Sequence, residues 1–153
     1  MKPLIIAVVV LAAAPALAGH YFIADVPDIV PETHHKALAA AGIQTTADLY
    51  DHTATLKDRR AFAARTGIPE HDLAEWAKFI DLLQISGVGP KMVRLLNAAD
   101  IGTLKALQAA DAATLSQKMK EANRGNRFSE LVPDADVVTG WIAQAKKIAP
   151  RLE

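Results

Sequence analysis

The sequence predicts an all-α protein, and three observations point to this fold class. Apolar residues recur at helical spacing in one segment after another, as at Leu73, Trp76 and Ile80. Prolines and glycines stand at the edges of these segments, where helices begin and end. No long stretch alternates apolar and polar residues, as a half-buried β-strand would. We therefore expect helices joined by short turns and packed as one compact domain.

The first 18 residues are expected to form a secretory signal peptide that is not part of this fold. Lys2 supplies the basic start, residues 4–13 are apolar and uncharged, and Ala16-Leu17-Ala18 is a small-x-small cleavage signal. The alternative is a retained membrane anchor, but Pro15 and the short apolar run argue against it, because a membrane span needs roughly 20 residues. The sequence thus predicts a mature chain that starts at Gly19, lies in the periplasm or outside the cell, and does not contact the membrane.

Four helices are expected in the first half, each with a start or stop signal. They cover about 31–41, 47–52, a segment from Thr53 or Thr55 to just before Gly67, and 69–84. Gly42 and Gly67 fit the position after a helix C-terminus, and Thr45 or Thr46 fits an N-cap. Glu70 follows Pro69 in the first turn of the last of these helices, where the helix dipole favours an acid.

Four more helices are expected in the second half. They cover about 90–99, 104–110, 111–122 and 133–148. Asp111 is a suitable N-cap for the third, and Pro133 opens the fourth. Between these two helices, residues 123–127 are expected to form a flexible basic loop.

The segment Ile85–Lys91 joins the two halves and is predicted to be a tight hairpin that opens into a helix. Gly87 and Gly89 can take backbone conformations that other residues avoid, and they let another backbone or a ligand come close. Pro90 suits the first helical position. The start of such a helix presents unpaired N–H groups and a partial positive charge, which suit a phosphate. The alternative is a compact turn with no ligand.

At these residues the sequence resembles a known class of module. Gly87-Val88-Gly89-Pro90-Lys91 resembles the glycine hairpin of helix-hairpin-helix DNA-binding modules, and the continuation to Ile101-Gly102-Thr103-Leu104 fits the same pattern. Over the mature chain it is similar to a bacterial family, domain of unknown function 4332. The resemblance implies that the hairpin N–H groups hold a backbone phosphate, often with a shared monovalent cation. The residues expected to contact phosphate are Gly87, Val88, Gly89, Lys91, Arg94 and, in the basic loop, Arg124 and Arg127. For the loop, a purely solvated role is the alternative.

The two halves are expected to be an internal duplication. Residues 26–31 occupy the place of 85–90, and Trp76 occupies the place of Trp141. We therefore expect a degenerate helix-hairpin-helix-like repeat over 19–84 and a repeat with the glycine hairpin over 85–153. In the first hairpin, Asp28 and Val30 replace the glycines, and Asp28 would repel a phosphate.

Composition excludes several other classes of function. The chain has no cysteine, which excludes disulfides and thiolate metal sites. No serine or histidine stands in a familiar catalytic or metal-binding arrangement, so we expect no enzyme activity, metal site or small-molecule substrate. Trp76 and Trp141 fall on apolar stripes, so we expect core anchors rather than base-stacking platforms.

Charge is balanced overall, with 17 basic and 17 acidic residues, but it is unevenly distributed. Residues 19–83 are acidic and the segment from Gln84 onward is basic, so a polyanion should approach the second half. The preferred interpretation is an exported, non-enzymatic helical module that binds duplex DNA through phosphates. The alternative is a periplasmic interaction or scaffold protein that binds no nucleic acid, which the neutral net charge and the degenerate hairpin favour.

Overall fold

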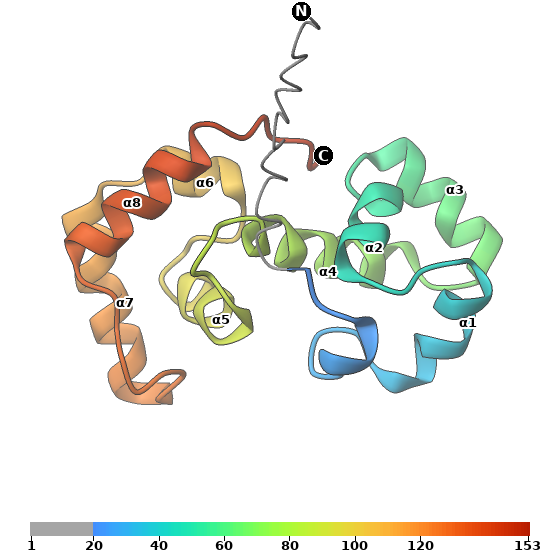
Figure 1. The fold of residues 1–153 in the computed structure, drawn as a ribbon, viewed down its shortest axis with the longest axis horizontal. Coiled ribbons are helices and arrows are strands. Elements are labelled where there is room, and N and C mark those ends of the chain that lie inside the picture. Colours follow the sequence, from blue (N-terminus) through green and yellow to red (C-terminus); the bar gives the residue numbers. More distant parts are fainter. Residues whose placement is uncertain (1–19) are drawn as a thin grey trace, which may run out of the picture.

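The structure, a computed structural model, describes residues 20–153, and helices make up most of this range (Figure 1). The elements are η1 (Ile23–Asp25), η2 (Glu32–His34), α1 (His35–Ala40), α2 (Thr46–Thr53), α3 (Leu56–Thr66), α4 (Glu70–Leu83), α5 (Pro90–Ala98), α6 (Leu104–Gln108), α7 (Ala112–Asn126) and α8 (Ala135–Ala145). Within 20–153 there is no strand, only one isolated bridge between Phe22 and Thr45. The predicted all-α fold class is therefore confirmed. The predicted signal peptide and its cleavage site after Ala18 lie outside the described residues.

Local signals explain where most of these helices begin and end. Thr45 and Thr55 cap α2 and α3, each accepting a hydrogen bond from the backbone N–H three residues on. Asp111 caps α7 in the same way. Gly67 follows α3 in the left-handed conformation, with φ of 72°.

The predicted basic loop at 123–127 is wrong, because α7 continues through Asn126. The side chain of Asn123 accepts a hydrogen bond from the Ser129 N–H at 3.1 Å and donates one to the Ser129 carbonyl at 2.8 Å. Arg127 ends the helix with φ of 50°, and its N–H donates to the Asn123 carbonyl at 2.8 Å. The last helix also starts two residues later than predicted, because Asp134 rather than Pro133 precedes it and caps it.

The ends of α1 and α5 share one local geometry. Gly42 and Asp100 stand after these helices with positive φ values of 83° and 68°. In both places the next residue, an isoleucine, donates its N–H to a leucine carbonyl five residues earlier, at 3.0 and 2.9 Å. The helices α1 and α5 therefore end in the same way.

The core runs through both halves, and α4 lies in the middle of the fold. Figure 1 shows α1, α2 and α3 on one side of α4 and α5 to α8 on the other. Trp76 and Trp141 are 6% and 5% exposed, which confirms both as core residues. No helix in the described part of the chain is long and apolar enough to span a bilayer.

A buried carboxylate in α4 connects the two groups of helices. Asp81 is 1% exposed and accepts a hydrogen bond from the Tyr50 hydroxyl of α2 at 2.6 Å. It also accepts one from the Leu104 N–H at the start of α6, at 2.6 Å, and one from the Gln84 side chain at 3.2 Å. Asp81 therefore ties α2 and α6 to the central helix.

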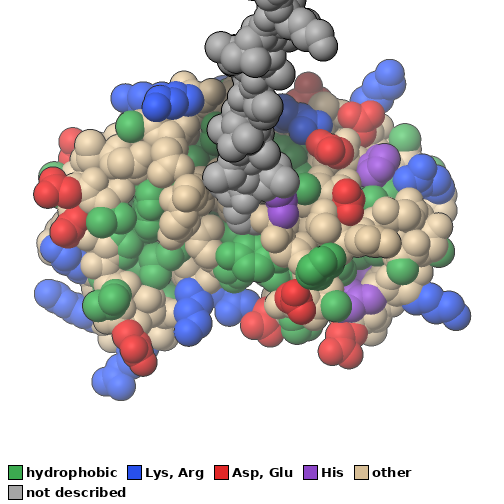
Figure 2. Space-filling view, viewed as in Figure 1, with side chains coloured by type: hydrophobic (Ala, Val, Ile, Leu, Met, Phe, Trp, Pro, Cys, Tyr) green, Lys and Arg blue, Asp and Glu red, His purple; other side chains and the backbone are tan. Residues whose placement is uncertain are grey.

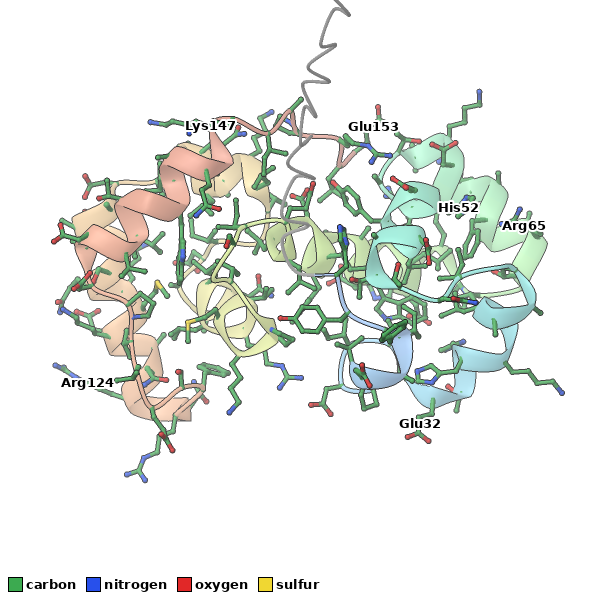
Figure 3. All side chains as sticks on the ribbon, in the orientation of Figure 1. Glu32, His52, Arg65, Arg124, Lys147 and Glu153 are labelled. Atoms are coloured by element: carbon green, nitrogen blue, oxygen red, sulfur yellow. The ribbon has the colours of Figure 1, made fainter. Side chains whose placement is uncertain are left out.

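The segment after α8 returns to the first half and provides a second connection. The buried Arg59 donates to the Glu153 main-chain oxygen at 2.7 Å, and the Glu153 carboxylate accepts from the Leu56 N–H at 3.0 Å. Arg151 pairs with Asp51 at 2.7 Å. Figure 3 labels Glu153 next to the helices of the first half.

Candidate functional site

The glycine hairpin is a four-residue turn that leads into α5. The Val88 N–H donates to the Ile85 carbonyl at 3.0 Å and closes the turn. Gly87 is its third residue, with φ of 88°, a value that favours glycine. The Val88 side chain is 2% exposed and anchors the turn in the core. Of the residues predicted to contact phosphate, Val88 thus has its N–H engaged within the turn and its side chain buried.

Gly89 is the N-cap of α5 and provides no side chain to cap it. Its φ of −92° and ψ of −179° are extended values that any residue can adopt. Pro90 has no N–H, and the N–H groups of Lys91 and Met92 have no hydrogen-bond partner among residues 20–153. The first turn also contains no acidic residue. The start of α5 thus offers two N–H groups that no described residue uses, at the partially positive end of the helix.

Two carbonyl groups of the hairpin are available for the monovalent cation that the resemblance implies. The carbonyl oxygens of Gly87 and Val88 accept no hydrogen bond from any described residue. Hard cations prefer such oxygen ligands. These two oxygens are the ones that would hold the ion.

The first hairpin lies beside the glycine hairpin and brings acids to it. Arg94 of α5 pairs with Asp28 at 3.1 Å between its Nη2 and the Asp28 Oδ2. A groove of about 430 Å³ separates the two hairpins. Its charged lining residues are Asp25 and Asp28 on one side and Lys91 and Arg94 on the other. The positive charge of Arg94 is therefore partly neutralised by Asp28, whereas Lys91 is exposed and makes no ion pair with a described residue.

Arg124 and Arg127 belong to another part of the surface. They lie in the last turn and at the C-terminal end of α7, and Figure 3 shows Arg124 away from α5. A helix C-terminus is partially negative, so basic side chains there have a structural reason to be present. The structure does not join these two arginines to the hairpin. The residues predicted to contact phosphate therefore lie in two places, at the hairpin and start of α5 and at the end of α7.

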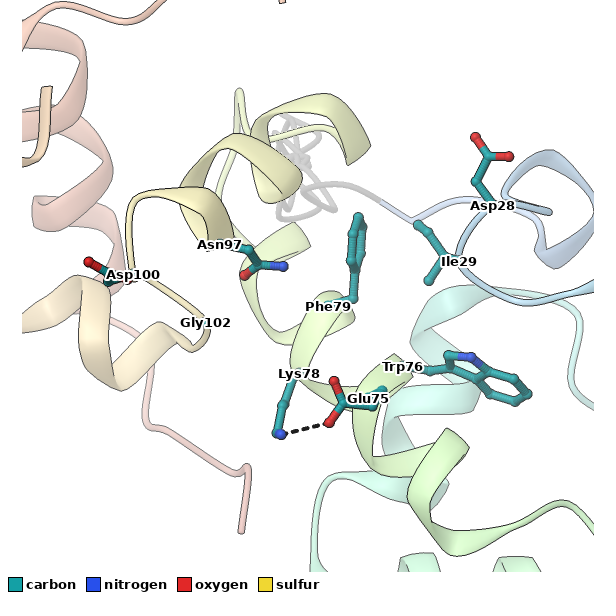
Figure 4. A pocket seen from close by; sticks show the side chains of 9 residues that line it. All are labelled: Asp28, Ile29, Glu75, Trp76, Lys78, Phe79, Asn97, Asp100 and Gly102. Atoms are coloured by element: carbon teal, nitrogen blue, oxygen red, sulfur yellow. Dashed lines mark hydrogen bonds and ion pairs between the residues drawn. The ribbon is translucent and has the colours of Figure 1, made fainter. Parts of the chain in front are cut away.

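A cavity of about 630 Å³ lies between the first hairpin, α4 and the end of α5 (Figure 4). Its acidic residues are already paired. Glu75 binds Lys78 at 2.8 Å, Asp28 binds Arg94, and Asp100 binds Lys118 at 3.3 Å. Across 20–153 no three His, Asp or Glu side chains come together as a metal site would require.

Charges of both signs are interspersed on the surface. On the face drawn in Figure 2, Lys and Arg side chains alternate with Asp and Glu over both sides, with no continuous basic patch. Ion pairs such as Arg94 with Asp28 and Lys118 with Asp100 contribute to this mixing. Both sides of this face thus carry charges of both signs.

Two neighbours of the hairpin were missed by sequence reasoning. A Cβ atom built on Gly87 would lie 3.3 Å from Trp141 Nε1, and one built on Gly89 would lie 3.3 Å from Tyr21 Oη. Both glycines therefore allow the polar tip of an aromatic side chain to come close. No local pattern signals these contacts, because they join residues far apart in the chain.

The comparisons with known proteins identify a family but no activity. The family model described as "Domain of unknown function (DUF4332)" matches residues 28–148. No curated protein and no solved structure matches the chain.

Proposed function

Because the chain belongs to the family of the domain of unknown function (DUF4332), whose description gives no activity, we propose a function from the site itself. The protein is a non-enzymatic helical binding module, and its glycine hairpin holds a backbone phosphate of duplex DNA. The observation that carries this proposal is the open start of α5, where the Lys91 and Met92 N–H groups have no partner among the described residues. Helix N-termini of this kind bind phosphate through N–H groups and the helix dipole.

The proposal includes a helix-hairpin-helix-like unit in each half, with the first unit degenerate. The matching ends of α1 and α5 and the groove between the two hairpins support this arrangement. Asp28 in the first hairpin stands next to Arg94, so only one hairpin offers an open phosphate site. Binding through one phosphate site reads no bases, and we therefore expect it to be independent of DNA sequence.

Lys91→Ala tests the proposal through the salt dependence of binding. We expect weaker binding to every duplex sequence and a salt dependence shallower by about one counterion, because one phosphate-neutralising charge is lost. The measurement is fluorescence anisotropy of labelled duplex DNA at two or more salt concentrations. Lys57→Ala, which removes an exposed lysine of α3, should leave both quantities unchanged. Absence of wild-type binding at low salt, where electrostatic attraction is strongest, would reject DNA as the ligand.

A second candidate function is a scaffold or interaction protein of the periplasm that binds another protein and no nucleic acid. The ion pair between Arg94 and Asp28 favours it, because it occupies a cation that a phosphate would use. The mixed charges in Figure 2 favour it as well. In this case the hairpin is a structural turn, and the partner would be sought by affinity capture from periplasmic extract.

Export is part of the proposal for either function. The basic start, apolar run and Ala16-Leu17-Ala18 signal favour cleavage by signal peptidase. We expect the intact mass of the exported protein to correspond to a chain that starts at Gly19. A mass that still includes residues 1–18 would instead indicate a retained anchor.

A further inference from the structure

The indole N–H of the largely buried Trp141 lies close to the glycine hairpin. Trp141 is 5% exposed, and its Nε1 lies 3.3 Å from the position that a Gly87 Cβ would occupy. This N–H has no hydrogen-bond partner among residues 20–153, although buried tryptophans usually find one. Gly87 itself is exposed to solvent. The indole N–H and the solvent-exposed Gly87 therefore lie next to each other.

Helix α8, which carries Trp141, makes a second contact with the hairpin. Gln144, one turn after Trp141 on α8, accepts a hydrogen bond from the Ser86 N–H at 3.0 Å. Residues three apart on a helix share a face, so α8 presents both side chains to the hairpin. The position of the indole relative to the hairpin is therefore fixed by a second contact.

A second aromatic side chain reaches the next glycine. The hydroxyl oxygen of Tyr21 lies 3.3 Å from the Cβ position of Gly89, at the start of α5. The hydroxyl makes no hydrogen bond within the described part of the chain, whereas the Tyr21 backbone N–H donates to Thr46 at 3.1 Å and fixes the segment. A side-chain donor thus lies close to each of the two glycines that precede α5.

We propose that Trp141 and Tyr21 belong to the phosphate site, with the indole N–H and the phenol O–H donating to oxygens of the phosphodiester held at the start of α5. This inference rests on the proposed function and extends it. The site is then built from three distant parts of the chain, before α1, at the hairpin and in α8. Hydrogen bonds to a charged phosphate are the stronger kind, so each donor should contribute measurably to affinity.

The test replaces Trp141 with phenylalanine and uses Trp76→Phe as the matched control. Both changes remove an indole N–H and keep an aromatic ring at an equally buried position, but Trp76 lies in the half without the glycine hairpin. We expect Trp141→Phe to weaken duplex DNA binding about tenfold. Trp76→Phe should bind as the wild type does, and Tyr21→Phe should weaken binding to a similar degree as Trp141→Phe.

A spectroscopic measurement gives the same answer without removing the donor. The chain has two tryptophans, so Trp76→Phe leaves the Trp141 indole as the single indole signal in an ¹H–¹⁵N spectrum. This signal should shift when duplex DNA is added. If the wild type binds DNA but Trp141→Phe matches Trp76→Phe and the indole signal stays in place, Trp141 is only a core residue and the inference is wrong. If the wild type binds no DNA, both the inference and the DNA function are wrong.

Discussion

Replacing Gly89 with aspartate should weaken DNA binding by at least about tenfold and leave the protein folded. Gly89 caps α5 with extended backbone angles, so an aspartate fits there without positive-φ strain. Aspartate is also a preferred N-cap residue, and its carboxylate would accept from the Lys91 or Met92 N–H. These are the donors proposed for the phosphate, and the added charge would repel it. We expect binding to fall by about tenfold or more, with the free energy of unfolding changed by less than about 1 kcal/mol.

Gly89→Ala separates the effect of charge from the effect of size. It adds a Cβ 3.3 Å from the Tyr21 hydroxyl, which must move by a few tenths of an ångström, but it adds no charge and no cap. Binding of this variant should therefore lie between those of the wild type and Gly89→Asp. Anisotropy gives the affinities and urea unfolding gives the stabilities. If Gly89→Asp is folded and binds DNA normally, the hairpin is not the phosphate site.

Gly87 is unsuitable for this experiment, because its role in the hairpin differs from that of Gly89. Its φ of 88° strains any other residue, so a substitution changes the turn and the site together. The sequence predicts a glycine turn here without distinguishing the two glycines. In the structure, Gly87 provides the backbone conformation, whereas Gly89 provides only space.

The helices could be predicted from the sequence because their signals are local. The spacing from Thr45 to Asp48 is enough to specify the start of α2, where side chain and backbone bond each other in both directions. The end of α7 depends instead on Asn123 reaching Ser129, beyond the helix. Asn and Gly at 123–126 have low helix propensity, so the local sequence alone predicts a loop there.

The surroundings of the site could not be predicted, because they depend on tertiary contacts. Arg94 and Asp28 are 66 positions apart in the chain, and only the packing of the two hairpins brings them together. One signal was available for Asp81. It follows Ala77 by four residues and therefore lies on the same buried stripe of α4.

The hydrogen bonds of Asp81 also affect the titration of Tyr50. Burial raises the pKa of Tyr50 above its usual value of about 10, and its hydrogen bond to Asp81 raises it further. The folded state therefore holds this proton more tightly than the unfolded state does. This contribution to stability is complete below about pH 10 and decreases as the pH rises above that value.

Asp81→Ala should lower the free energy of unfolding by about 3–5 kcal/mol, because it leaves the buried Tyr50 hydroxyl and Leu104 N–H without an acceptor. Urea unfolding at neutral pH measures this loss. Tyr50→Phe removes only one of the donors and should cost about 1–2 kcal/mol, and it should also remove the Tyr50 contribution to alkaline destabilisation. Glu75→Ala is the control, since it removes an exposed acid of the same helix and should cost less than about 1 kcal/mol. Equal stabilities of the Asp81 and Glu75 variants would mean that the buried carboxylate does not hold the two groups of helices together.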